Sequence, residues 1–148
     1  MAWAHLKAGE IGQAQDAVSA ASCSLEFGPH KDLAPGSDSV APTGKTVLLG
    51  RLLAVRSAIA LAMGMPDEAV ELSGDAVRKL ETVCEIPADP LVLRQHATAL
   101  RKRGQDVAAV EYGQKAHNEA VRRADLIGNE ELRETYMAKM SAQGTPDG

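Results

Sequence analysis

The segment 39–46, with the sequence SVAPTGKT, comes closest to a catalytic motif. It ends in the letters GKT directly before a predicted helix, as a phosphate-binding loop does, where glycine lets backbone N–H groups point at phosphates and lysine reaches them. Ser39 replaces the first glycine of that motif, and a polar, proline-rich stretch precedes it instead of an apolar strand. The simpler interpretation is that Thr43 or Thr46 caps the helix. Nucleotide binding through residues 44–46 remains the alternative.

The other residue types that could do chemistry are scattered. None of the four histidines has a metal-ligating partner three or four residues away on one helix face: they are His5, His30, His96 and His117. The two cysteines, Cys23 and Cys84, fall in predicted helices and are expected to be small buried side chains. No serine lies in a recognisable nucleophile elbow. We therefore expect no catalytic residues, no metal site and no cofactor.

Composition narrows the class of protein further. The chain has 148 residues, enough for one domain, with 45% hydrophobic and only 3% aromatic residues. A low content of aromatic residues together with many alanines favours helices over a β-sandwich or barrel. The formal net charge of −4 argues against a general nucleic-acid or anionic-membrane binder. Without a long apolar run or a signal-peptide pattern, the expected location is the cytoplasm.

Helical spacing of apolar residues divides the chain into four parts. The predicted parts are a partial N-terminal helical hairpin at 1–27, a Pro/Gly-rich loop or linker at 28–46, two hairpins with a C-terminal capping helix at 47–140, and a disordered tail at 141–148. Within the third part, the helices are expected at 47–63, 66–83, 91–103, 106–127 and 130–140, with glycine or proline between each helix and the next.

Three stretches of the chain repeat one pattern of small residues. In each, a turn glycine is followed by an alanine five residues later and by another seven residues after that. The three sets are Gly9, Ala14 and Ala21; Gly64, Ala69 and Ala76; and Gly104, Ala109 and Ala116. An antiparallel helical hairpin needs such a pattern, because glycine permits the tight turn and alanines let the helix axes approach closely.

This pattern resembles the tetratricopeptide repeat (TPR) family, whose unit is a helical hairpin that stacks into a superhelix. The small residue that the family places seven positions before the turn glycine is matched by Ala2, Ser57 and Ala97. The glycines lie 55 and 40 residues apart, further than in the family unit, and aliphatic residues mostly occupy its aromatic positions. The stretch AVRRADLIGNEELRETYM also resembles the C-terminal repeats of large bacterial ATP-binding regulators. The resemblance implies an all-α fold of antiparallel hairpins stacked as a short right-handed solenoid.

In TPR arrays the first helix of each hairpin lines a concave groove, which here implies helices 47–63 and 91–103. On the second of these, Arg94, Thr98 and Arg101 share one helix face, and Arg51 is the expected counterpart on the first. The expected partner-binding residues are Arg51, Ala54, Ala58, Leu61, Arg94, Thr98 and Arg101. Arginines that pair with carboxylates, beside small residues that allow close approach, would suit an acidic peptide or a partner helix.

The sequence thus predicts a non-catalytic protein–protein interaction module, a scaffold or regulatory domain that binds a protein or peptide in a concave groove. Two alternatives remain open at this point. One is an NTP-binding regulatory fragment that uses residues 39–46. The other is a structural module that forms homo-oligomers through its N-terminal end.

Overall fold

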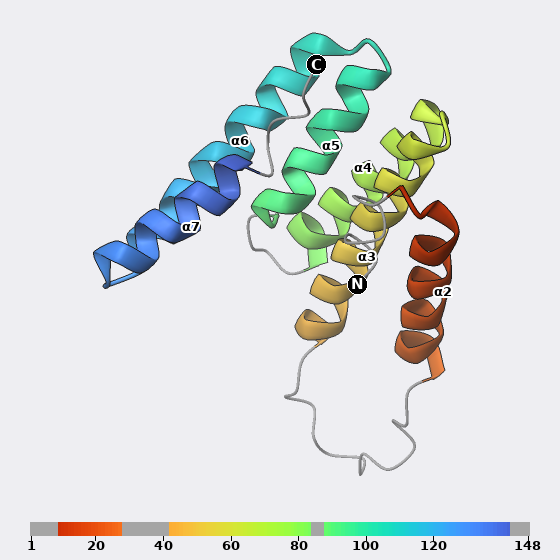
Figure 1. The fold of residues 1–148 in the computed structure, drawn as a ribbon, viewed down its shortest axis with the longest axis horizontal. Coiled ribbons are helices and arrows are strands. Elements are labelled where there is room, and N and C mark those ends of the chain that lie inside the picture. Colours follow the sequence, from red (N-terminus) through yellow and green to blue (C-terminus); the bar gives the residue numbers. More distant parts are fainter. Residues whose placement is uncertain (1–8, 28–41, 84–87, 143–148) are drawn as a thin grey trace.

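The computed structural model describes residues 9–27, 42–83 and 88–142 (Figure 1). They form the helices α2 (Ile11–Phe27), α3 (Pro42–Ala62), α4 (Pro66–Val83), α5 (Pro90–Lys102), α6 (Asp106–Asp125) and α7 (Glu130–Ala142). No strand occurs in these ranges, which confirms the predicted all-α class. None of the described helices has the combination of length and hydrophobicity that crossing a membrane requires.

Each helix packs against the next one in the sequence, and α3 also packs against α5. The pairs α3–α4 and α5–α6 are antiparallel hairpins, and α7 lies along α6 (Figure 1). Helix α2 packs on the side of α3 through a cluster in which Ala14 and Val18 meet Val55 and Ile59. The helices therefore follow one another in space in the order of the chain.

The two hairpin turns use the same backbone hydrogen bonds. The N–H of Gly64 donates to the carbonyl of Leu61, and the next N–H, of Met65, donates to Ala60. Gly104 and Gln105 repeat this pattern with Arg101 and Leu100. The glycines have φ angles of 75° and 83°, a left-handed conformation that a side chain disfavours. This pair of bonds is the Schellman motif that ends a helix at glycine.

The first alanine of each repeat also has an equivalent place in the structure. Its N–H donates to the carbonyl of the residue that follows the turn glycine, in the pairs Ala14–Glu10, Ala69–Met65 and Ala109–Gln105. All three alanines have no exposed surface. Gly9 has a φ of 76°, like the other two turn glycines. The predicted repeat of turn and alanine is therefore present in the backbone of all three stretches.

The central core lies where the two hairpins meet. It contains Ala54 from α3, Ala76, Val77 and Leu80 from α4, Ala88, Val92 and Leu93 at the start of α5, and Ala116 from α6. Within the first hairpin, α3 and α4 come very close at Gly50. A Cβ built there would lie 2.9 Å from Leu80 Cγ, so glycine allows this approach.

Three predictions about the loop and α2 are corrected by the structure, and α7 also runs two residues into the predicted tail at 141–148, the rest of which lies outside the described residues. Helix α3 begins at Pro42 rather than at residue 47, so 42–46 belongs to the helix and not to the loop. Proline suits this position, because its φ is already helical and the N–H that it lacks would have no partner in the first turn. The rest of the predicted loop, 28–41, lies outside the described residues.

The other two corrections concern α2. Ala21, predicted to pack within its hairpin, is exposed, whereas its counterparts Ala76 and Ala116 are buried in the central core. No described helix precedes α2, so nothing in the described residues gives Ala21 the contact that α3 gives Ala76. Cys23 is exposed rather than buried. Nine residues turn a helix by about half a circle, which places Cys23 opposite Ala14.

Candidate functional site

The predicted binding residues fall into two groups in the structure. Arg51, Ala58, Arg94, Thr98 and Arg101 keep at least part of their surface exposed, and we call the surface that they form on α3 and α5 the α3–α5 face. Ala54 is only 3% exposed and belongs to the central core, so the prediction that it lines a groove is wrong. A wide part of the α3 surface is buried against α4, and Ala54 lies on that part. Leu61 is partly buried and packs against Ala60, Ala69 and Ala99.

Arg51 is held in an ion cluster at the start of α5. Its Nη2 lies 2.6 Å from Oδ2 of Asp89, a carboxylate that is nearly buried. The other Asp89 oxygen accepts the N–H of Leu91 at 3.0 Å, which caps α5 ahead of Pro90. Arg51 is thus already paired with an anion, although its side chain keeps 55% of its surface exposed.

The same cluster continues into α6. Arg123 Nη1 lies 3.5 Å from Asp89 Oδ2, and its Nε donates to Glu119 at 2.8 Å. Arg122 donates two hydrogen bonds of 2.8 Å to the carboxylate of Glu119. The bonds from Arg122 are the main cause that lowers the pKa of Glu119, and the bond from Arg123 adds to it. Three arginines and two carboxylates therefore tie α3, α5 and α6 together.

Sequence reasoning missed the carboxylates of this cluster, but signals for them exist. Asp89 directly before Pro90 is the usual sign of a helix N-cap followed by proline at the first helical position. Glu119 followed by Arg122 and Arg123 has the three- and four-residue spacing of helical ion pairs. Neither signal shows that Asp89 meets Arg51, because that contact depends on how α3 and α5 pack.

Arg94 contacts the C-terminal end of the described chain. It is half-buried and donates a hydrogen bond to the backbone carbonyl of Met140 in α7. Burial lowers the pKa of the Arg94 guanidinium, and the interaction with Tyr136 partly offsets this. Arg94 therefore anchors α7, which leaves it less available to an incoming partner than the sequence suggests.

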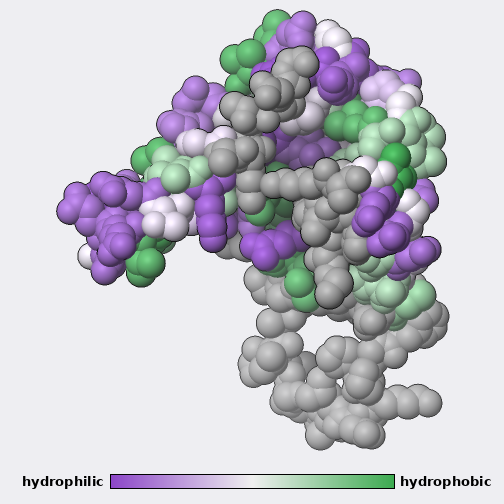
Figure 2. All heavy atoms as spheres, viewed as in Figure 1, coloured by the Kyte–Doolittle hydropathy of each residue, from purple (hydrophilic) through white to green (hydrophobic). Residues whose placement is uncertain are grey.

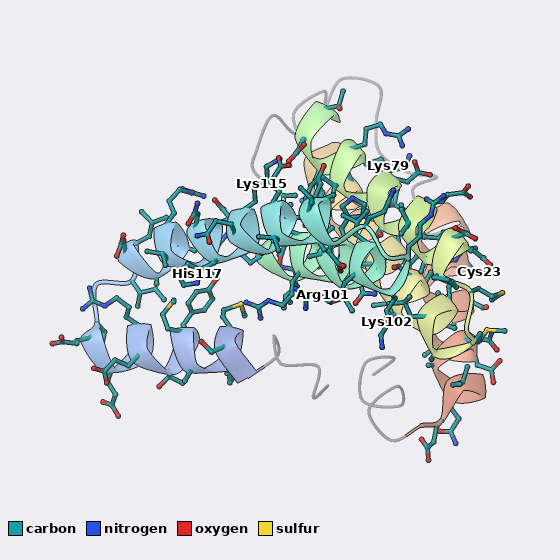
Figure 3. The ribbon with its side chains drawn as sticks, turned by 90° about the horizontal axis from the view of Figure 1, so that it is seen from above. Cys23, Lys79, Arg101, Lys102, Lys115 and His117 are labelled. Atoms are coloured by element: carbon teal, nitrogen blue, oxygen red, sulfur yellow. The ribbon has the colours of Figure 1, made fainter. Side chains whose placement is uncertain are left out.

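Arg101 is the arginine of the predicted strip that keeps its charge available. It is exposed, and no ion pair or side-chain hydrogen bond involves it within the described residues. Figure 3 places Arg101 and Lys102 on α5, on the side of the molecule where α2 and α7 lie. Thr98, one turn earlier, donates its hydroxyl to the carbonyl of Arg94. The available positive charge of the α3–α5 face is thus concentrated at the C-terminal end of α5.

Beneath this face lies a buried polar network that the sequence did not predict. Ser73 Oγ lies 2.8 Å from His96 Nδ1 and 2.7 Å from the carbonyl of Ala69. Ser57 donates to the same carbonyl at 2.8 Å and accepts from Gln95 at 3.3 Å. The rings of His96 and Tyr112 pack nearly perpendicular to each other, with centroids 4.5 Å apart.

The serine–histidine contact fits a structural role better than a catalytic one. Ser73 has one hydroxyl proton, and the carbonyl of Ala69 is its nearest acceptor. His96 Nδ1 is the second hydrogen-bond partner of this hydroxyl, and the tautomer of the imidazole sets which of the two donates. Ser73 has no exposed surface, so a substrate could not reach its hydroxyl.

The segment considered for phosphate binding is helical where the structure describes it. Residues 42–46 form the first turn of α3, and 39–41 lie outside the described ranges. Among the described residues, no group of three or more histidine, cysteine or acidic side chains is arranged to hold a metal ion.

Comparison with known proteins adds no relative. No family model, curated protein or solved structure matches this chain, so the functional argument rests on its own residues.

Proposed function

We propose that this chain is a TPR-like, short right-handed solenoid that binds a protein or peptide and has no catalytic activity. The observation that supports this most strongly is the equivalence of its turns. Turn glycines with φ angles of 76°, 75° and 83° are each followed at the fifth position by a fully buried alanine. A unit repeated in this way produces stacked hairpins, whose function in repeat proteins is to present an extended surface.

The α3–α5 face is the binding surface in this proposal. Helices α3 and α5 are the first helices of their hairpins and pack side by side. Arg101 and Lys102 supply positive charge at one end. Ala58 and Thr98 have small side chains, so the backbone of a bound peptide can approach the helices closely. An acidic peptide is the ligand that this charge favours, because arginine pairs with carboxylates through two parallel hydrogen bonds.

A peptide-display selection tests this function. We expect the full chain to enrich acidic peptides. The double variant Arg101→Glu, Lys102→Glu should bind the selected peptides about tenfold more weakly, because it replaces attraction by repulsion. Arg78→Glu is the matched control, since Arg78 is an exposed arginine on α4 that pairs only locally with Asp75.

Three results would contradict the proposal. They are no enrichment of acidic peptides, equal binding by the double variant, and an equal loss in Arg78→Glu. A rise in melting temperature with nucleotide and magnesium would instead favour the NTP-binding alternative. The alternative of self-association through the N-terminal end predicts a homo-oligomer in solution, which a measurement of molecular mass detects.

A further inference from the structure

An open pocket of about 510 Å³ lies between α2, α3 and α4. Its deepest side chains are Val18, Ile59 and Ala60, which are 6%, 5% and 3% exposed. Leu72 of α4 lines another wall. None of these residues belongs to the α3–α5 face, so the pocket is a separate site. Its volume lies in the usual range for small-molecule sites.

One end of the pocket is apolar and adaptable. Met63, at the end of α3, and Met65, in the turn, line it together. Gln15 Nε2 lies 3.2 Å from Met63 Sδ, which joins α2 to α3 at this end. Methionine side chains are unbranched and polarisable, so they can fit around a flexible apolar chain. Figure 2 shows hydrophobic residues over this end of α3 and α4, whereas the projecting end of α6 and α7 is mainly hydrophilic.

The other end of the pocket carries a positive charge. Arg56 is the cation among the lining residues, and its side chain is exposed. No ion pair of the described residues involves Arg56. Glu68 also lines the pocket but forms no ion pair with Arg56. One arginine without an ion pair in the described residues suits a singly charged carboxylate.

The spacing along α3 sets the length of a suitable ligand. Arg56 and Met63 are seven residues apart on the helix, which corresponds to about 10 Å of helix axis. This is comparable to the extended alkyl chain of decanoate. Between them, Ile59 and Ala60 are apolar residues that line the pocket.

We propose that this pocket binds a linear, medium-chain carboxylate. Its carboxylate pairs with Arg56, and its alkyl chain lies over Ile59 and Ala60 toward Met63 and Met65. Burial of the chain supplies most of the affinity, and the arginine fixes its orientation. The site is independent of peptide binding on the α3–α5 face.

Isothermal titration of the full chain with decanoate, below its micelle concentration, tests this inference. Arg56→Gln should weaken decanoate binding about tenfold and leave binding of decanol unchanged, because decanol has no charge to pair. Ser19→Trp should abolish binding of both, since Ser19 is an exposed lining residue of α2 and a bulky ring there fills the pocket. Arg78→Gln, at an exposed arginine outside the pocket, should bind decanoate like the wild type.

A second titration distinguishes a fatty acid from a peptide C-terminus as the source of the carboxylate. A short peptide that ends in leucine offers the same combination of carboxylate and apolar group. We expect it to bind more weakly than decanoate, because its backbone amides would be buried without partners. Absence of decanoate binding, equal binding by Arg56→Gln, or tighter binding of the peptide would overturn the proposal. Circular dichroism spectra and melting curves of each variant establish that it is folded.

Discussion

At the scale of single residues, the hydroxyl of Ser73 links the interior of the first hairpin to the second through hydrogen bonds. It forms hydrogen bonds with His96 Nδ1 and with the carbonyl of Ala69, so one oxygen connects α4 to α5. All side-chain polar atoms that are buried in the described residues have a hydrogen-bond partner. Buried polar groups of this kind stabilise a fold only while each partner is present.

Replacing Ser73 by alanine should therefore lower the free energy of unfolding by about 1–3 kcal/mol, because His96 Nδ1 loses its hydrogen-bond partner in a buried site. Ser22 provides a matched control. Its hydroxyl makes the same bond to the carbonyl four residues earlier, that of Val18, but no interhelical contact. Ser22→Ala should change the stability by less than about 0.5 kcal/mol. Urea denaturation measures both, and equal losses would contradict this account of Ser73.

His96 should make the stability depend on pH. Burial lowers its pKa below the ordinary value of 6.5, so the unfolded chain binds this proton more readily than the folded chain. The contribution of neutral His96 is complete above pH 6.5 and is lost as the pH falls from there toward the lower folded pKa. His96→Gln should flatten the fall in the free energy of unfolding between about pH 7 and 5. An unchanged slope in His96→Gln would refute the prediction.

At the scale of the elements, glycine and proline made the helix boundaries predictable. The ends at Gly64 and Gly104 and the start of α4 at Pro66 follow from local backbone chemistry, which a sequence displays directly. The start of α3 at Pro42 could not be predicted in this way, because a proline can either end a loop or open a helix. The cap at Asp89 was missed for a similar reason, since a proline such as Pro90 can end one helix as well as open the next.

A pair of glycine substitutions tests these boundaries with opposite signs. Gly104→Ala should destabilise the chain by about 1–2 kcal/mol, because φ is 83° there and alanine disfavours this region. Gly113→Ala should stabilise it by about 0.5–1 kcal/mol, because Gly113 lies within α6 and an added Cβ meets nothing within 4 Å. Thermal unfolding of both variants gives the answer. A stabilising effect of Gly104→Ala would show that the turn does not need its glycine.

At the scale of the whole molecule, the repeat could be predicted from the sequence, but which arginines lack a partner in the described residues could not. Alanine spacing depends on local helix geometry, and it placed Ala69, Ala76, Ala109 and Ala116 in the interior correctly. The state of each arginine depends on distant partners. Arg51 meets Asp89 and Arg94 meets Met140, across 38 and 46 residues, and neither contact has a periodic signal in the chain. Of the arginines in the predicted strip, Arg101 is the one without an ion pair or side-chain hydrogen bond in the described part of the chain.

The repeat can be tested by adding volume at two equivalent positions. Ala76→Leu should lower the free energy of unfolding by about 1–3 kcal/mol, because Ala76 has no exposed surface where α4 meets the core. Ala21→Leu, at the same repeat position in α2, should change it by less than about 0.5 kcal/mol, because Ala21 is exposed. Chemical denaturation compares the two. A large loss in Ala21→Leu would mean that α2 has a packed neighbour on that side.

The most direct test of the central claim is to map the bound peptide by NMR. The titration uses a selected acidic peptide and the isotope-labelled full chain. We predict that amide shifts are largest at Ala58, Thr98 and Arg101 and small along the outer surface of α6, where Val107 and Val110 are exposed. Shifts confined to α6, or no shifts with any acidic peptide, would contradict binding at the α3–α5 face.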